Sequence, residues 1–179
     1  MPRKNINKPG KGLSSSRAIF LDRDGVINEL IYDAEHGRIE TPILPTQFRL
    51  LDSVTTALRI LKRLGYKIIL VSNQPAVAKK DMTMEMFDKL RRKMHLELSA
   101  GGIQLDGEYY CLHHPYAKIP SMRKKCRCRK PKPGLLLKAA QEHGINLKRS
   151  IMVGDGLTDI EAGRAAGCKT ILLGHMNSL

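Results

Sequence analysis

Residues 18–28 read Ala18-Ile19-Phe20-Leu21-Asp22-Arg23-Asp24-Gly25-Val26-Ile27-Asn28. A continuous apolar run is typical of a buried parallel strand, and open α/β sheets bind their ligands at the carboxyl ends of such strands. This run ends in Asp22 and Asp24, which an extended backbone directs to the same side. Two like charges held this close are unfavourable unless a cation or a shared proton relieves them. The segment therefore predicts a parallel sheet with an acidic site at its edge, the alternative being a solvated Asp-x-Asp turn.

Apolar, β-branched runs alternate with segments of helical periodicity along the rest of the chain, which predicts βαβ units and a parallel sheet. Thr83 is a plausible helix N-cap, and Gly65 suits a left-handed helix end. The segments 29–47 and 113–130 have no regular pattern and are long enough to be functional loops. The predicted strands are 17–22, 67–72, 108–111, 150–154 and 169–173, and the predicted helices are 52–64, 83–99, 133–143 and 159–166.

Composition limits the class of protein. The 179 residues suffice for one domain, predicted over 17–179 after a flexible basic tail at 1–16. No apolar run approaches the roughly 18 residues of a membrane span, and the N-terminus lacks the apolar region of a secretory signal. We therefore expect a cytoplasmic protein without a membrane partner, and we expect a monomer. The net charge of +14 favours anionic partners, either phosphorylated small molecules or nucleic acid, although only 4% of the residues are aromatic and could stack on bases.

Further polar residues lie at the ends of predicted strands or near the starts of predicted helices. In chain order they are Ser72-Asn73-Gln74, Arg129-Lys130, Asp155 and Asp159. With the carboxylate pair at 22 and 24, this order resembles the four motifs of the haloacid dehalogenase superfamily, and residues 154–160 closely match its final motif. The resemblance implies an α/β fold, a Rossmann-like three-layer sandwich with a central parallel sheet. No large cap domain fits between the motifs.

The resemblance also implies phosphomonoester hydrolysis with Mg²⁺ held by Asp22, Asp155 and the backbone carbonyl of Asp24. All-oxygen ligation suits this hard cation. Asp22 would attack phosphorus to form an aspartyl-phosphate, and Asp24 would protonate the leaving alcohol and later accept a proton from water.

Other residues are expected around the substrate. Ser72, Asn73 and Lys130 would bind the non-bridging phosphate oxygens, with Arg129 beside Lys130 and Gln74 also at the substrate. Asp159 would orient Lys130 or a metal-bound water. Taken alone, Ser72 or Asp159 could equally be a helix cap. Candidates for binding a second anionic group are Arg38, Lys79, Lys80 and Arg129.

Cysteines and histidines form a second group, Cys111-Leu112-His113-His114 followed by Cys126-Arg127-Cys128. Cys111, His113, Cys126 and Cys128 suit a closed tetrahedral Zn²⁺ site, with His114 as a reserve ligand. Without a secretion signal, metal binding is favoured over disulfides. The alternative is two unrelated pairs of buried cysteines. Cys168 is predicted to be a small core residue.

This zinc-binding loop resembles the subgroup of the superfamily that contains phosphatases of D-glycero-D-manno-heptose 1,7-bisphosphate and of histidinol phosphate. Ser72 and Gly156 stand where we expect Thr and Lys in the heptose enzymes. The resemblance implies a small phosphorylated sugar as the substrate, first of all the 7-phosphate of the heptose bisphosphate. Histidinol phosphate and a polynucleotide end are the alternatives. A zinc-stabilised scaffold without activity conflicts with the intact acidic residues.

Overall fold

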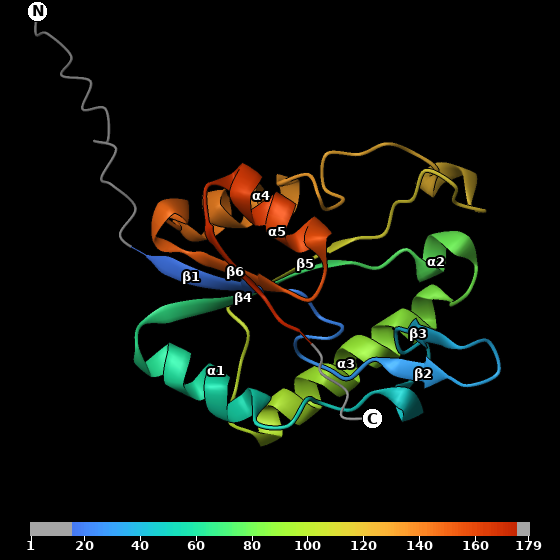
Figure 1. The fold of residues 1–179 in the computed structure, drawn as a ribbon, viewed down its shortest axis with the longest axis horizontal. Coiled ribbons are helices and arrows are strands. Elements are labelled where there is room, and N and C mark those ends of the chain that lie inside the picture. Colours follow the sequence, from blue (N-terminus) through green and yellow to red (C-terminus); the bar gives the residue numbers. More distant parts are fainter. Residues whose placement is uncertain (1–15, 175–179) are drawn as a thin grey trace, which may run out of the picture.

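A five-stranded sheet in the order β5-β4-β1-β6-β7 forms the centre of the computed structural model, which describes residues 16–174 (Figure 1). Every pair of neighbouring strands is parallel, so all carboxyl ends lie at one edge. The predicted α/β class with a central parallel sheet is confirmed. The strands are β1 (Arg17–Leu21), β4 (Tyr66–Asn73), β5 (Gly107–Cys111), β6 (Ile151–Gly154) and β7 (Lys169–Leu172).

Helices cover both faces of the sheet and produce the three predicted layers. The helices α1 (Val54–Arg63) and α3 (Met84–Ala100) pack on one face, and α4 (Gly134–His143) and α5 (Leu157–Ala166) on the other (Figure 1). Two apolar clusters follow from this arrangement, one on each side of the sheet. Burial on both sides explains why β1 and β4 read as continuous apolar runs rather than alternating ones.

The predicted helix boundaries hold at three of the ends that sequence signals marked. The Thr83 hydroxyl accepts a hydrogen bond from the Met86 amide at 3.1 Å, as expected of an N-cap. Gly65, with φ of +81°, follows the end of α1. Gly144, with φ of +58°, ends α4. The helix α5, however, begins at Leu157 instead of at residue 159, because the Asp159 carboxylate accepts from the Gly156 amide and so belongs to the first turn.

Segments expected to be loops contain short regular elements. Residues 29–47 include the antiparallel hairpin of β2 (Ile31–Asp33) and β3 (Arg38–Glu40). The short helix α2 (Ala76–Lys79) follows β4 directly. Single 3₁₀ turns lie at Pro45–Gln47, Pro120–Met122 and Leu147–Arg149. The predicted alternation missed the hairpin because its two strands are mostly exposed and carry no apolar periodicity.

The predicted basic tail, residues 1–16, lies outside the described residues except for Ser16. The Ser16 carbonyl accepts a hydrogen bond from the Asn146 amide at 2.8 Å, which connects the residue before β1 to the segment after α4. Within residues 16–174, none of the helices combines the length and the apolar character that crossing a membrane requires.

Candidate active site

Carboxylates from two neighbouring strands meet at the edge of the sheet. Asp22 follows β1 and Asp155 follows β6, and the bond from the Asp22 amide to the Val153 carbonyl (3.1 Å) keeps these ends side by side. Asp22, Asp155 and Asp159 each offer an oxygen, and these atoms lie within 4.8 Å of one another. An all-oxygen donor set of this charge and spacing fits a hard divalent cation such as Mg²⁺. We refer to these three residues as the acidic cluster.

Lys130 is the buried counter-charge of this cluster. Its side chain is 1% exposed, and its ammonium lies 3.0 Å from Asp22 Oδ2 and 2.5 Å from Asp159 Oδ1. It also donates to the Val71 carbonyl at 2.9 Å. A buried ammonium is costly without such partners, so these contacts fix its position at the floor of the site.

Asn73 ties the Lys130 segment to the end of β4. Its side-chain amide donates to the Lys130 carbonyl, and its side-chain oxygen accepts from the Lys130 amide, both at 3.1 Å. The structure thus places Asn73, which the sequence suggested as a substrate ligand, on the backbone of the lysine. Its side chain positions Lys130 across 57 residues of sequence.

Asp159 lies behind Lys130, and a glycine makes room for it. A Cβ added at Gly154 would overlap the Asp159 carboxyl group, so this strand end requires glycine. Burial raises the pKa of Asp159, the negative charge of Asp22 adds to the rise, and the Lys130 ammonium opposes it. The ion pair with Lys130 agrees with the orienting role expected for Asp159, which also belongs to the acidic cluster.

Asp24 is held by a buried ring of donors. Its carboxylate accepts from the Arg23 guanidinium at 2.9 Å, from Asn28 Nδ2 at 3.0 Å and from Gln74 Nε2 at 2.6 Å. Gly25, with φ of +72°, turns the chain so that these side chains face one another. Arg23 and Asn28 are 1% and 0% exposed. The sequence analysis missed both, although polar residues inside an otherwise apolar segment were a visible signal.

Gln74 joins several parts of the site. Besides its bond to Asp24, its Nε2 donates to Ser72 Oγ at 3.1 Å, and its backbone amide donates to the Cys111 carbonyl at 2.8 Å. Both Ser72 and Gln74 are almost completely buried. Gln74 was expected to contact substrate, whereas here its amide group positions Asp24 and Ser72.

The predicted arginines lie further out. Arg129 is half-buried, and its Nη1 lies 3.4 Å from the His113 carbonyl. Arg38 is exposed on β3, opposite Asp33 in the hairpin register. The hydrogen bond from His36 lowers the pKa of Asp33, and the charge of Arg38 contributes less. Arg38 therefore interacts with Asp33 across the hairpin, and its role in binding substrate stays a prediction.

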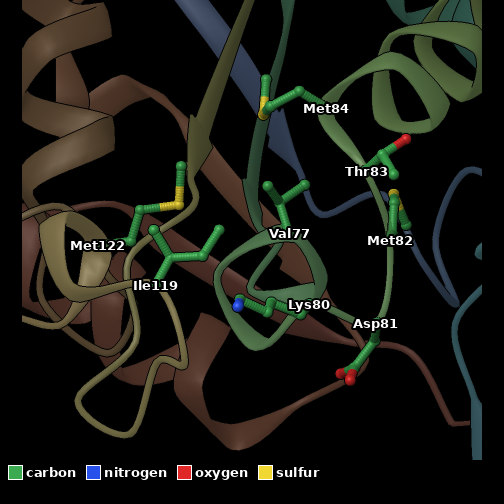
Figure 2. A pocket seen from close by; sticks show the side chains of 8 residues that line it. All are labelled: Val77, Lys80, Asp81, Met82, Thr83, Met84, Ile119 and Met122. Atoms are coloured by element: carbon green, nitrogen blue, oxygen red, sulfur yellow. The ribbon is translucent and has the colours of Figure 1, made fainter.

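Two cavities lie next to α2, and each of the two predicted lysines, Lys79 and Lys80, lines a different one. Lys79 lines a cavity of about 410 Å³ together with Glu40, Thr41, Ile43, Gln74, Pro75, Ala76 and Asp81. Lys80 lines an apolar cavity of about 470 Å³, shown in Figure 2, with Val77, Asp81, Met82, Thr83, Met84, Ile119 and Met122. Of the two, only the Lys79 cavity includes Gln74 and so borders the site of Asp24.

A second cluster lies at the end of β5, which β4 separates from β1. We refer to its members, Cys111, His113, Cys126 and Cys128, as the thiol cluster. Its four potential ligand atoms all lie within 4.8 Å of one another. The Cys111 sulfur is 3.5 Å from that of Cys126 and 3.2 Å from that of Cys128. A tetrahedral zinc site with bonds of about 2.3 Å separates its sulfurs by about 3.8 Å, so the arrangement is close to what zinc requires.

The electrostatics of His113 also fit a metal site. Burial lowers the pKa of His113, and Lys124 adds to this, which favours the neutral imidazole that a metal ion binds. The reserve ligand His114 instead accepts a hydrogen bond from the Tyr116 amide at 3.1 Å. Cys111, Cys126 and Cys128 form one group in this structure and not two unrelated pairs, while Cys168 is buried in the core beside α4 and α5.

Comparison with known proteins identifies relatives over most of the chain. Residues 29–167 match the haloacid dehalogenase-like hydrolase family. The chain is 40% identical over 156 residues to the D-glycero-beta-D-manno-heptose-1,7-bisphosphate 7-phosphatase of Salmonella typhi, covering 87% of this chain and 79% of that protein. The enzyme of the same name from Vibrio cholerae is 38% identical, with 87% of this chain and 80% of that protein covered.

A solved structure supports the same relationship. The D,D-heptose 1,7-bisphosphate phosphatase from B. bronchiseptica, complexed with magnesium and phosphate, superimposes with a TM-score of 0.73 and 29% sequence identity. The superposition covers 87% of this chain and 79% of that one.

Proposed function

The chain belongs to the haloacid dehalogenase-like hydrolases, and we propose that it removes the 7-phosphate of D-glycero-D-manno-heptose 1,7-bisphosphate. One observation carries the reaction type: Asp22, Asp155 and Asp159 converge at the carboxyl edge of the sheet, where the buried Lys130 ammonium contacts Asp22 and Asp159. The substrate is suggested by the relatives with 38–40% identity. They favour the heptose bisphosphate over histidinol phosphate and polynucleotide ends.

Asp22 is the proposed nucleophile. Its side chain is 16% exposed, whereas those of Asp24, Asp159 and Lys130 are 8% exposed or less, so Asp22 is the most accessible of these four groups. The Arg23 amide donates to its Oδ1 at 2.7 Å, and Lys130 holds its Oδ2. These contacts fix a carboxylate oxygen for in-line attack on phosphorus, which forms an acyl phosphate as the ester P–O bond breaks.

Asp24 is the proposed acid and base. It gives a proton to the departing alkoxide, and in the second step it takes a proton from the water that attacks the acyl phosphate. The net reaction consumes one water and releases the alcohol and inorganic phosphate. Arg23, Asn28 and Gln74 fix the position of the Asp24 carboxyl group for both steps.

The Ser72 hydroxyl and the Lys130 ammonium are proposed to bind the non-bridging oxygens of the phosphoryl group. They would stabilise the negative charge on this group during its transfer. Asp22, Asp155 and the Asp24 carbonyl would hold Mg²⁺, which neutralises the repulsion between carboxylate and phosphate when bound.

The thiol cluster is proposed to hold a structural zinc ion that braces this machinery. Cys128 directly precedes Arg129 and Lys130 in the chain. Cys111 binds the Gln74 amide through its carbonyl. A fixed metal centre therefore restrains both the lysine segment and the residue that holds Asp24.

A phosphate-release assay with Mg²⁺ tests the proposal. We expect kcat/KM for the heptose bisphosphate to exceed that for histidinol phosphate and for a 5′-phosphorylated oligonucleotide by about 10²-fold or more. Equal or greater efficiency with either alternative would contradict the assigned substrate. Added salt should reduce activity on the oligonucleotide much more than activity on the small substrates, because binding to a polyanion weakens steeply with salt.

We also propose that the protein is a cytoplasmic monomer. Light scattering tests the oligomeric state, and cell fractionation tests the location.

A further inference from the structure

The cavity bordered by Lys79 lies directly beside the proposed acid and base. Gln74, which lines it, donates to Asp24 Oδ2 at 2.6 Å. Its opposite wall comes from the end of β3, where Glu40 and Thr41 leave the hairpin. At about 410 Å³ it has the size of a small-molecule site.

The charges of the lining indicate what this cavity accepts. Glu40 and Asp81 contribute two carboxylates, Lys79 contributes one ammonium, and the Lys118 ammonium lies 3.9 Å from Asp81 Oδ1. The Asp81 side chain points away from Met82 of the neighbouring apolar cavity (Figure 2). Carboxylates accept hydrogen bonds from hydroxyl groups and repel phosphate. With its charges balanced and the Glu40 carboxylate in its wall, the cavity suits a neutral polyol better than a second anionic group.

The hairpin segment that carries Glu40 is closed at its base by backbone hydrogen bonds close to Asp24 in the chain. The Glu29 amide donates to the Arg49 carbonyl and the Leu51 amide to the Ile27 carbonyl, both at 3.0 Å. Asn28, which donates to Asp24, forms an isolated bridge with Leu50 between these bonds. The base of the hairpin segment is thus closed next to Asp24, so Glu40 is carried by an anchored element.

We propose that this cavity is a subsite for the neutral, polyhydroxylated part of the substrate next to the scissile phosphate, with Glu40 as its specificity residue. Its carboxylate accepts hydrogen bonds from the hydroxyl groups of the leaving alcohol, and Lys79 donates from the opposite side. The subsite rests on the proposed phosphatase function and adds the orientation of the substrate. The second phosphate then lies outside this cavity.

Matched substrates separate the contribution of hydroxyl groups from catalysis. Glucitol 6-phosphate and n-hexyl phosphate share a six-carbon chain and differ in hydroxyl groups. We expect the wild-type protein to prefer glucitol 6-phosphate and Glu40→Gln to reduce that preference about tenfold, the cost of a hydrogen bond to a charged group. Efficiency with n-hexyl phosphate should stay within twofold. The control Glu35→Gln, on the same hairpin but outside the cavity lining, should change neither.

The outcomes distinguish the subsite from the proposed function. An equal loss for both substrates in Glu40→Gln would indicate a structural role and overturn the subsite, as would an unchanged ratio. A wild-type protein without preference for glucitol 6-phosphate would overturn it as well. The wild-type protein could prefer glucitol 6-phosphate, and Glu40→Gln could lose this preference, while neither hydrolyses the heptose bisphosphate. That result would refute the assigned heptose and uphold the subsite.

Discussion

The acidic cluster and the thiol cluster lie at the same edge of the sheet, with β4 between the strands that carry them. One offers hard carboxylate oxygens, and Asp22 within it remains partly accessible. The other offers three sulfurs and one imidazole, which would complete a tetrahedron around a zinc ion and leave no open position. In the proposed function, the open oxygen site serves the reaction and the closed sulfur site serves the fold. Perturbing them should therefore affect activity and stability differently.

The largest expected effect is on activity alone. Asp22→Asn removes the nucleophile, so we expect kcat to fall at least about 10⁴-fold. The melting temperature should stay within about 4 °C of wild type, which corresponds to about 1 kcal/mol for a domain of this size. Phosphate release and calorimetry measure both.

The exposed Asp52→Asn is the matched control and should alter neither quantity. Activity of Asp22→Asn within tenfold of wild type would refute Asp22 as the nucleophile.

The second effect combines stability with activity. Cys128→Ser removes one ligand of the thiol cluster, and loss of a structural metal costs about 4 kcal/mol or more. We expect the melting temperature to fall by about 10 °C, zinc content to fall in metal analysis, and kcat to fall because the Lys130 segment is released.

Cys168→Ala serves as the comparison, because it also removes a buried thiol but lies in another part of the core. It should leave the zinc content unchanged. Unchanged zinc content in Cys128→Ser would rule Cys128 out as a ligand.

A third, smaller effect tests the residue that links the two regions. Gln74→Met keeps the backbone bond to Cys111 but removes the side-chain donor to Asp24. A hydrogen bond to a charged group contributes about 1.5–3 kcal/mol to stability, so we expect the melting temperature to fall by about 3–10 °C. We also expect kcat to fall by about 10- to 100-fold because the Asp24 carboxyl group is no longer held in place, with zinc content close to wild type.

The exposed Gln104→Met provides the control for the same chemical change. A loss of zinc in Gln74→Met would show that its side chain supports the thiol cluster instead of Asp24.

The smallest expected effect concerns the thiols themselves. Burial raises the pKa of Cys168 to about 11, so at pH 8 only about a thousandth of this thiol is ionised and reactive. Burial also acts to raise the pKa of Cys126, but hydrogen bonds from the neighbouring thiols of Cys128 and Cys111 outweigh this effect and lower the pKa. After chelation of zinc, a disulfide reagent should therefore react with Cys126 well before Cys168. Rapid reaction of all four thiols in the metal-loaded protein would argue against a closed zinc site.

Much of the fold followed from the sequence because buried strands and polar strand ends leave strong local signals. The apolar run before Asp22 and the polar run after Val71 each marked a strand and its functional end. The hairpin was missed because it is stabilised by local turns: Asp33 Oδ1 accepts from the Glu35 and His36 amides, and its strands are largely exposed.

Parts of the site were beyond sequence reasoning because they depend on distant partners. Asn73 and Gln74, predicted to bind substrate, contact Lys130 and Asp24 in the structure, and their role at the substrate stays a prediction. The separation of 57 residues between Asn73 and Lys130 leaves no local signal. Arg23 and Asn28, by contrast, lie one and four residues from Asp24 in the sequence, so they were open to prediction as its partners.

The closed base of the hairpin segment has a consequence for how such enzymes diverge. The Glu29–Arg49 and Ile27–Leu51 backbone hydrogen bonds lie on either side of Asn28, so residues 30–48 form an insertion whose two ends are paired with each other. Replacement of this insertion would change the cavity wall that carries Glu40 without disturbing the strands that position Asp22. Substrate range could therefore change in such enzymes while the reaction stays the same.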